Sequence, residues 1–160
     1  MNEIRYETPI ESVDFNLDTI FLAGPTVRGN QPHLTSWRFE AIRLFAEKKF
    51  NGNLIIPEFV DTRESDKHRN DIPLWELSGL EKSHMIMFWI PRTMELIGLT
   101  TNYEFGYWTA RDRNKIVYGR PDNAYRIKYL DIMWLAERRS WNELRPIYKT
   151  LADTVDAVLV

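Results

Sequence analysis

Residues 84–90, with the sequence HMIMFWI, are the stretch that decides the fold. Apolar side chains fill consecutive positions here, so both faces of a strand at this place would be covered. A strand covered on both faces lies in the middle of a sheet that has helices on either side. We therefore expect residues 84–90 to be a central strand of a parallel sheet.

Shorter segments of the same kind lie on either side along the chain. Further strands are expected at 18–24 (DTIFLAG), 53–57 (NLIIP) and 115–119 (KIVYG). Helices are expected at 34–50, 72–82, after Thr101, at 123–138 and at 150–159. A polar stretch, 58–71, is the best candidate for a mobile loop. The alternation of strand and helix predicts an α/β fold with a parallel sheet wrapped by helices.

Composition limits the classes of function. A length of 160 residues is most economically one domain, 1–160, with a proper core. A net charge of −2 argues against binding to a nucleic acid polymer or to an anionic membrane surface. The chain has no cysteine, which excludes disulfides and thiolate metal sites and fits the cytoplasm. The N-terminal residues lack a signal-peptide pattern, and the longest apolar run is too short to cross a bilayer.

In open parallel sheets, ligands bind beyond the carboxyl ends of the strands. Those ends are expected at 23–26, 57–59, 91–104 and 119–123. The first of them carries neither a dinucleotide fingerprint nor a P-loop, so we expect no cofactor of these kinds. The three histidines, His33, His68 and His84, lack ligand spacing, and no metal is expected. Arginines near strand ends could meet a phosphate or could simply be exposed: Arg28, Arg92 and Arg120.

Glu104 stands out because it lies among aromatic residues, immediately after a strand-to-helix crossover. One interpretation is structural, since Thr101 and Glu104 match a capping box at a helix start. The other is catalytic, since a carboxylate in the first helical turn is held ionised by the helix dipole and suits a nucleophile. The two roles can coexist.

Glu76 is the second acid of interest, on the helix that leads into the central strand. It is either an exposed helix position or, if burial raises its pKa, a proton donor to a leaving group. An ionised and a protonated carboxyl group that flank a glycosidic bond are the equipment of retaining glycoside chemistry.

The sequence resembles the nucleoside 2-deoxyribosyltransferases and their nucleotide-hydrolysing relatives. The resemblance rests on IFLAGPT (20–26), WELSGLEKSHMIMFWIPR (75–92) and GLTTNYEFGYW (98–108). It implies a flavodoxin-like, three-layer αβα fold with a central parallel sheet of four to five strands. It also implies transfer of 2-deoxyribose between nucleobases through a covalent deoxyribosyl–glutamate intermediate, with a nucleoside or nucleotide and a nucleobase as partners.

On this resemblance Glu104 is the nucleophile and Glu76 protonates the leaving base. Gly24 and Pro25 match the turn beneath the substrate, and Arg92 follows the central strand where the resemblance expects substrate. The family's usual acid is an aspartate, with Asp71 as the other candidate in this chain. Where the family often carries an acid that binds the sugar hydroxyls, this chain has Gly98, and Asn102 could bind the sugar hydroxyls in its place.

Other outcomes of the same resemblance stay open. Water in place of an acceptor base would make the protein a hydrolase of 2′-deoxynucleosides or their 5′-monophosphates. A non-catalytic nucleotide-binding module would keep the pocket and use Glu104 only as a helix cap. The family shares its sites between subunits, which predicts a homo-oligomer.

Overall fold

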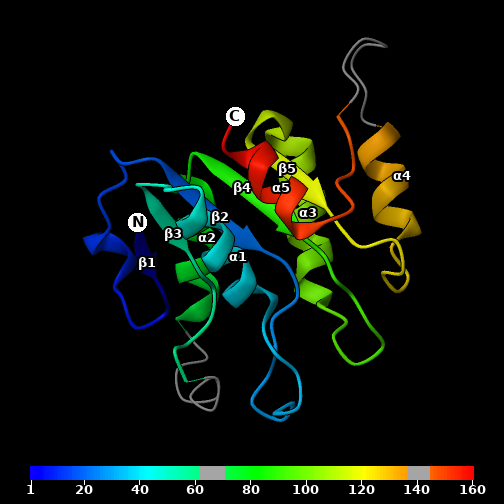
Figure 1. Ribbon diagram of the computed structural model, residues 1–160, viewed down its shortest axis with the longest axis horizontal. Helices are drawn as coiled ribbons and strands as arrows, with labels where there is room; N and C mark the ends of the chain where they lie inside the picture. Colours follow the sequence, from blue (N-terminus) through cyan, green and yellow to red (C-terminus); the bar gives the residue numbers. More distant parts are fainter. Residues whose placement is uncertain (62–70, 137–144) are drawn as a thin grey trace.

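The computed structural model describes residues 1–61, 71–136 and 145–160, and Figure 1 shows their arrangement around one sheet. The sheet has the order β1-β3-β2-β4-β5, and every neighbouring pair is parallel. Its strands are β1 (Asn2–Ile4), β2 (Thr19–Ala23), β3 (Asn53–Ile55), β4 (Met85–Trp89) and β5 (Ile116–Gly119). The helices are α1 (Trp37–Glu47), α2 (Ile72–Lys82), α3 (Leu99–Arg111), α4 (Lys128–Ala136) and α5 (Leu151–Val158). The predicted α/β class and parallel sheet are confirmed.

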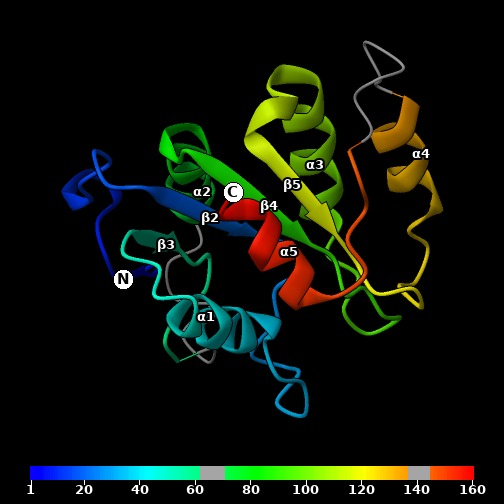
Figure 2. The same cartoon turned by 45° about the horizontal axis from the view of Figure 1, so that its top comes forward.

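Helices cover both faces of this sheet, as Figure 2 shows. Ile86 and Phe88 of β4 belong to the core cluster beneath α2, α3 and α4. The alternate residues, Met87 and Trp89, belong to the cluster beneath α1 and α5. The strand is therefore buried on both sides, and the prediction of a three-layer arrangement with residues 84–90 at its centre is confirmed.

The first strand, β1, was not among the predicted elements. It pairs with β3 at the edge of the sheet, with Asn2 opposite Asn53 and Ile4 opposite Ile55. Its three residues are exposed or only partly buried. So short and polar a segment has no hydrophobic period from which a strand could be predicted.

Among the described helices only α2 begins where predicted: α1 begins at Trp37 and α5 at Leu151, each within three residues of the prediction, and α3 and α4 also differ. α3 begins at Leu99, because Gly98 adopts a left-handed conformation (φ 61°) and serves as the N-cap. α4 begins at Lys128, after a turn that covers residues predicted to be helical. Leu135, an apolar residue of this helix, is exposed. Residues 137–138 of that predicted helix and 62–70 of the predicted mobile loop lie outside the described residues.

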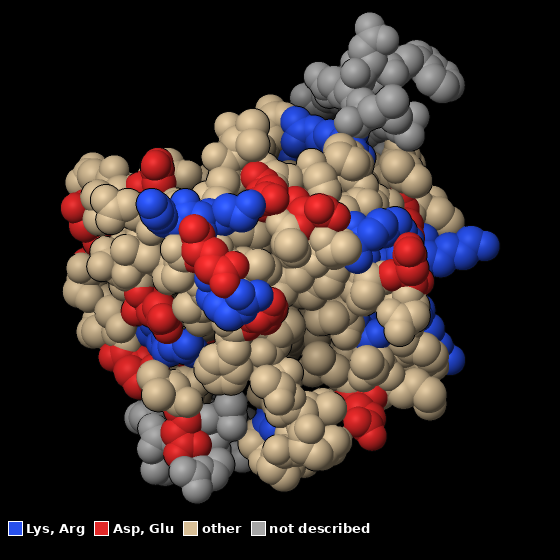
Figure 3. Space-filling view, in the orientation of Figure 1, with Lys and Arg blue, Asp and Glu red and all other residues tan. Residues whose placement is uncertain are grey.

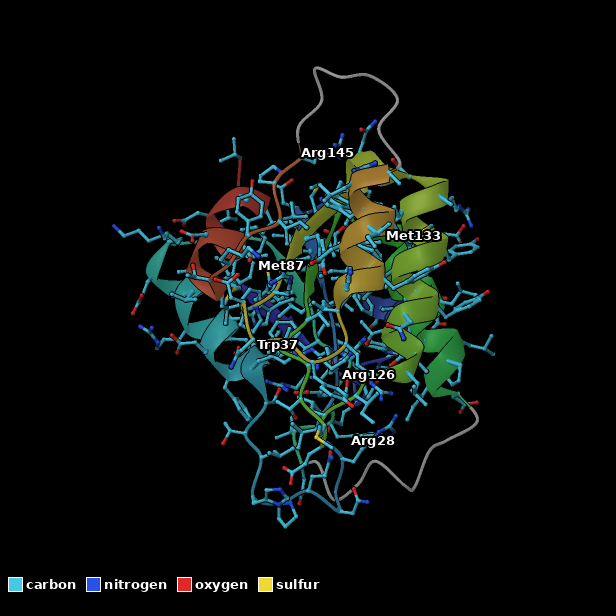
Figure 4. The ribbon with its side chains drawn as sticks, turned by 90° about the vertical axis from the view of Figure 1, so that its right-hand side faces the viewer. Arg28, Trp37, Met87, Arg126, Met133 and Arg145 are labelled. Atoms are coloured by element: carbon cyan, nitrogen blue, oxygen red, sulfur yellow. The ribbon has the colours of Figure 1, made fainter. Side chains whose placement is uncertain are left out.

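The chain changes direction between β2 and β4. From β2 it passes through α1 to β3 on one side, and then through α2 to β4 on the other side of β2. The carboxyl ends of β2 and β4 consequently diverge into opposite crossovers, and such a point is where parallel α/β sheets bind ligands. In Figure 4, Trp37 at the start of α1 and Met87 of β4 mark the core on the α1 side of the sheet, whereas Arg28 lies at the end of the molecule where these strands stop.

The visible surface carries both signs of charge. Figure 3 shows lysine, arginine, aspartate and glutamate interspersed on the face that bears α1 and α5. This face therefore lacks the single-sign patch typical of nucleic-acid binding. None of the described helices has the length and apolar character needed to cross a membrane.

Candidate active site

A cavity of about 510 Å³ lies beyond the carboxyl end of β2. Its walls come from segments that are distant in the sequence: residues 26–28, 58–59, 72–73 and 95–100, with Tyr6 and Glu76. Three of the four segments expected to form the site contribute to these walls, whereas none of the residues 119–123 does. No group of three or more His, Asp or Glu side chains placed to bind a metal occurs in the described part of the chain.

Glu76 lines this cavity from α2. The side chain is partly buried, so the interpretation of an exposed helix position is wrong. Burial raises the pKa of the Glu76 carboxyl, while the Tyr6 hydrogen bond and the charges of Arg38 and Arg28 oppose the rise. The Tyr6 hydroxyl donates that hydrogen bond to Oε1 of Glu76. Because Tyr6 is the donor, its hydroxyl favours the ionised form of Glu76.

Glu104 lies in the second turn of α3, not the first. Since Gly98 is the N-cap, Thr101 is inside the helix and does not cap it, and the predicted capping box is wrong. The Glu104 carboxyl has no hydrogen bond to any of the described residues. Burial and, next, the charge on Glu76 raise the pKa of Glu104 to about 8, while Arg38 acts in the opposite direction. The raised pKa contradicts the prediction that the helix dipole keeps Glu104 ionised, because the effect of the dipole fades beyond the first turn.

The charge on Glu76 affects the protonation of Glu104. It raises the pKa of Glu104, so the two groups do not both ionise near neutral pH. While Glu76 is ionised, Glu104 keeps its proton up to a pH of about 8. In that state the site carries one carboxylate and one carboxylic acid.

The structure places the other predicted residues around this pair in different ways. Gly98 lines the cavity, and a Cβ added to it would lie 2.9 Å from Pro25, so these two residues are in contact. Gly24 packs on β4, where an added Cβ would lie 2.1 Å from the Trp89 carbonyl oxygen. The absence of a side chain at Gly24 is thus required by the neighbouring strand.

Arg92 and Asn102 bind each other behind the site. Nη2 of the buried Arg92 donates to Oδ1 of Asn102 at 2.6 Å, and burial lowers the pKa of Arg92. Six of the predicted residues are not among the described residues that line the cavity: Arg92, Asn102, Glu104, Gly24, Pro25 and the exposed Asp71. Contact of the predicted residues with substrate stays a prediction.

Three residues of the site were missed from the sequence. Tyr6 follows an edge strand and has no motif around it. Arg38 and Glu58 form a buried ion pair (N–O distance 2.7 Å), although they are twenty positions apart in the chain. One signal was present, because Arg38 precedes the buried Ala41 by three positions and so shares its side of α1. An arginine on an apolar helix face needs a buried partner.

Comparison with known families agrees with this geometry. A family model described as "Nucleoside 2-deoxyribosyltransferase like" matches residues 18–122. The chain belongs to this family. No curated protein matches the chain. The matched residues of this nucleoside 2-deoxyribosyltransferase-like protein run from β2 past β5 and include both Glu76 and Glu104, while Tyr6 lies outside them. Membership indicates an enzyme of the nucleoside deoxyribosyltransferase kind, with small nucleoside substrates.

Proposed function

We propose that the protein transfers 2-deoxyribose between nucleobases through a covalent ester on Glu104. The observation that carries this proposal is a pair of acids, Glu76 on the cavity wall and Glu104 on α3, in which the charge on Glu76 raises the pKa of Glu104. A retaining transfer needs one carboxylate to attack and one carboxylic acid to protonate the leaving group. The pair meets both needs with a single proton.

In the first step the ionised tautomer of Glu104 attacks C1′ of the donor nucleoside. The C1′–N bond breaks, its electron pair goes to the base, and the proton on Glu76 moves to that base. Reaction therefore uses the tautomer in which Glu76 holds the proton. The Tyr6 hydroxyl favours the ionised form of Glu76 and so lowers the affinity of the Glu76 carboxyl for its proton. Glu76 is therefore a better proton donor to the leaving base.

In the second step a nitrogen of the acceptor base attacks C1′ of the ester. The C1′–O bond breaks, Glu104 leaves as a carboxylate, and the proton released by the acceptor returns to Glu76. Two displacements at C1′ give retention of configuration. Water as the acceptor would instead release free deoxyribose, so transfer and hydrolysis share the first step.

The ester intermediate gives a direct test. A slow 2′-fluoro-substituted deoxynucleoside should leave a sugar adduct on the intact protein, and peptide mapping should place the adduct on Glu104. Glu104→Gln should leave no adduct, whereas Glu81→Gln, on the exposed face of α2, should be labelled like the wild type. An adduct on any other residue, or labelling of Glu104→Gln, would contradict the proposed nucleophile.

A second measurement distinguishes the two acceptors. Incubation with deoxyinosine and adenine should yield deoxyadenosine if a base is the acceptor. Free deoxyribose without a new nucleoside would show that the enzyme is a hydrolase. The same incubation with deoxyinosine 5′-monophosphate tests whether a phosphate is part of the substrate.

We also propose that the protein works as a homo-oligomer. Family resemblance predicts this, and exposed apolar side chains on the outer side of α2 and α3 support it. Leu99, Tyr103 and Tyr107 follow one another at four-residue spacing along α3, and the first two are each 75% exposed. Leu74 and Leu77 are exposed on α2. Contiguous apolar surface of this kind is typical of protein interfaces.

A further inference from the structure

The ion pair between Arg38 and Glu58 is the most deeply buried pair of opposite charges among the described residues. Its side chains are 1% and 3% exposed. The desolvation of two buried charges offsets most of their attraction, so such a pair is weak evidence for added stability. Its position behind the cavity wall suggests a role in the site.

Arg38 binds the main chain that leaves β2. Its guanidinium donates to the carbonyl oxygens of Leu22 (2.9 Å) and Gly24 (2.9 Å), and more weakly to that of Pro25 (3.4 Å). It also donates to the Thr26 hydroxyl at 3.3 Å. The planar fork of an arginine can hold several acceptors at once, and a lysine cannot. Arg38 thereby fixes the first turn of the chain beyond the sheet.

Its contacts reach the cavity on two sides. Thr26 and Glu58 both line the cavity. The Glu58 carboxylate binds Arg38 and accepts from the Ser36 hydroxyl, while its main-chain oxygen accepts from the Tyr6 amide. Tyr6 in turn binds Glu76. The positive charge of Arg38 is thus held one residue behind the cavity wall that carries Glu76.

The described charged and titratable groups around Glu76 and Glu104 come from three helices and three loops. They are Tyr6 after β1, Arg28 after β2, Arg38 on α1, Glu58 after β3, and the two acids themselves on α2 and α3. Burial raises the pKa of Tyr6, of Glu76 and of Glu104, and in each case Arg38 lowers it. Among the cations that the structure describes, Arg38 alone acts on all three.

We propose that Arg38 is a positioning residue whose buried charge stabilises the carboxylate forms of Glu76 and Glu104, and that Glu58 limits how much of this charge reaches them. Without Arg38 the pair would hold its protons to higher pH and would present less carboxylate. Without the charge of Glu58 the pair would lose its last proton at lower pH. The catalytic meaning of the inference rests on the proposed function, whereas its electrostatic content does not.

The test is a titration of the Glu104 carboxyl by NMR in protein labelled with ¹³C at the glutamate carboxyl groups. The Glu104 resonance is assigned by its disappearance in Glu104→Gln. Arg38→Gln should raise the midpoint of this titration by about one pH unit. Arg38→Lys keeps the charge and should restore most of the wild-type midpoint, although it cannot hold the carbonyl oxygens.

Glu58→Gln is the decisive variant in this test, because the glutamine side chain can keep the hydrogen bonds of the Glu58 carboxylate while it removes the negative charge. It should lower the Glu104 midpoint by about one pH unit, the direction opposite to Arg38→Gln. A merely structural role predicts no such opposition. Should Arg38→Gln fail to fold, Glu58→Gln and Arg38→Lys still decide the matter. The matched control is Arg43→Gln on the exposed side of α1, which should leave the midpoint unchanged.

Two outcomes would overturn the inference: an unchanged Glu104 midpoint in Glu58→Gln, or shifts in the same direction for Glu58→Gln and Arg38→Gln. These results do not depend on turnover. If the protein showed neither transfer nor hydrolysis while the midpoints moved as expected, the proposed function would fail and the electrostatic role of Arg38 would stand. If turnover were normal and the midpoints did not move, the inference alone would fail.

Discussion

Glu104 makes the protein's stability depend on pH in an unusual direction. Folding raises the pKa of this carboxyl from the ordinary value of 4.5 to about 8. Between these two values the folded state keeps a proton that the unfolded chain has lost, so the free energy of unfolding decreases as pH rises through this interval. Most carboxyl groups have the opposite effect, since their pKa falls on folding.

Replacing Glu104 by glutamine should remove this dependence. Relative to the wild type, the free energy of unfolding of Glu104→Gln should rise by about 4 kcal/mol between pH 5 and pH 8.5, because the amide has no proton to lose. Urea unfolding at the two pH values measures the difference. Glu47→Gln, an exposed acid on α1, is the control and should show no comparable gain. Equal pH dependence in wild type and Glu104→Gln would contradict the raised pKa.

The same pKa predicts the pH profile of the reaction. The competent enzyme holds one proton on the pair, and the last proton leaves at a pH of about 8. We therefore expect kcat/KM to decrease as pH rises through about 8. A profile that instead increases through pH 8 would mean that only the ionisation of Glu104 matters and that Glu76 donates no proton. Glu81→Gln should keep the wild-type profile.

At the scale of the element, the start of α3 depends on a residue without a side chain. Gly98 has a left-handed backbone and touches Pro25. An alanine at this position would therefore strain the backbone, and its methyl group would clash with Pro25. Gly98→Ala should lower the free energy of unfolding by about 2 kcal/mol. Thermal or urea unfolding measures the change.

Gly106 in the same helix is the matched control. A Cβ added to it meets nothing within 4 Å, and its backbone is helical. Gly106→Ala should therefore stabilise the protein by about 0.5–1 kcal/mol through helix propensity alone. If both substitutions changed stability in the same direction, the special conformation of Gly98 would not explain the helix start.

Elements with a strong local pattern could be predicted from the sequence, and the others could not. The bounds of α2 match the prediction, because Pro73 marks its first turn and apolar residues recur at helical spacing. β1 was missed because its pairing with β3 specifies it and its own three residues do not. The start of α3 was misplaced because the pattern of a capping box also fits residues already inside a helix.

The site shows the same division. Glu76 and Glu104 could be chosen because the family resemblance covers them, but their raised pKa values depend on burial and, for Glu104, on the charge of Glu76, which no spacing encodes. The sequence favoured an ionised Glu104, whereas the fold favours a protonated one. Arg38 and Glu58 come together only through the packing of α1 against the sheet.

At the scale of the whole molecule, the exposed apolar residues of α3 predict an assembly. The wild type should be larger than a monomer by light scattering coupled to gel filtration. Tyr103→Glu, which places a charge in the middle of the apolar row, should shift the protein toward monomer. Glu47→Gln, on the opposite layer, should leave the mass unchanged. A wild type that is monomeric at all concentrations would contradict the proposed assembly.

The contact between Gly98 and Pro25 has a consequence for anyone who wishes to alter what the enzyme accepts. The two residues belong to crossovers that are more than seventy positions apart in the chain. A larger side chain at one of them nevertheless requires the other to move or to become smaller. Libraries that randomise either crossover alone would mostly contain variants in which these two residues clash. Variants with a new substrate preference are more accessible when both positions are randomised together, so that a larger side chain at one position is matched by a smaller one at the other.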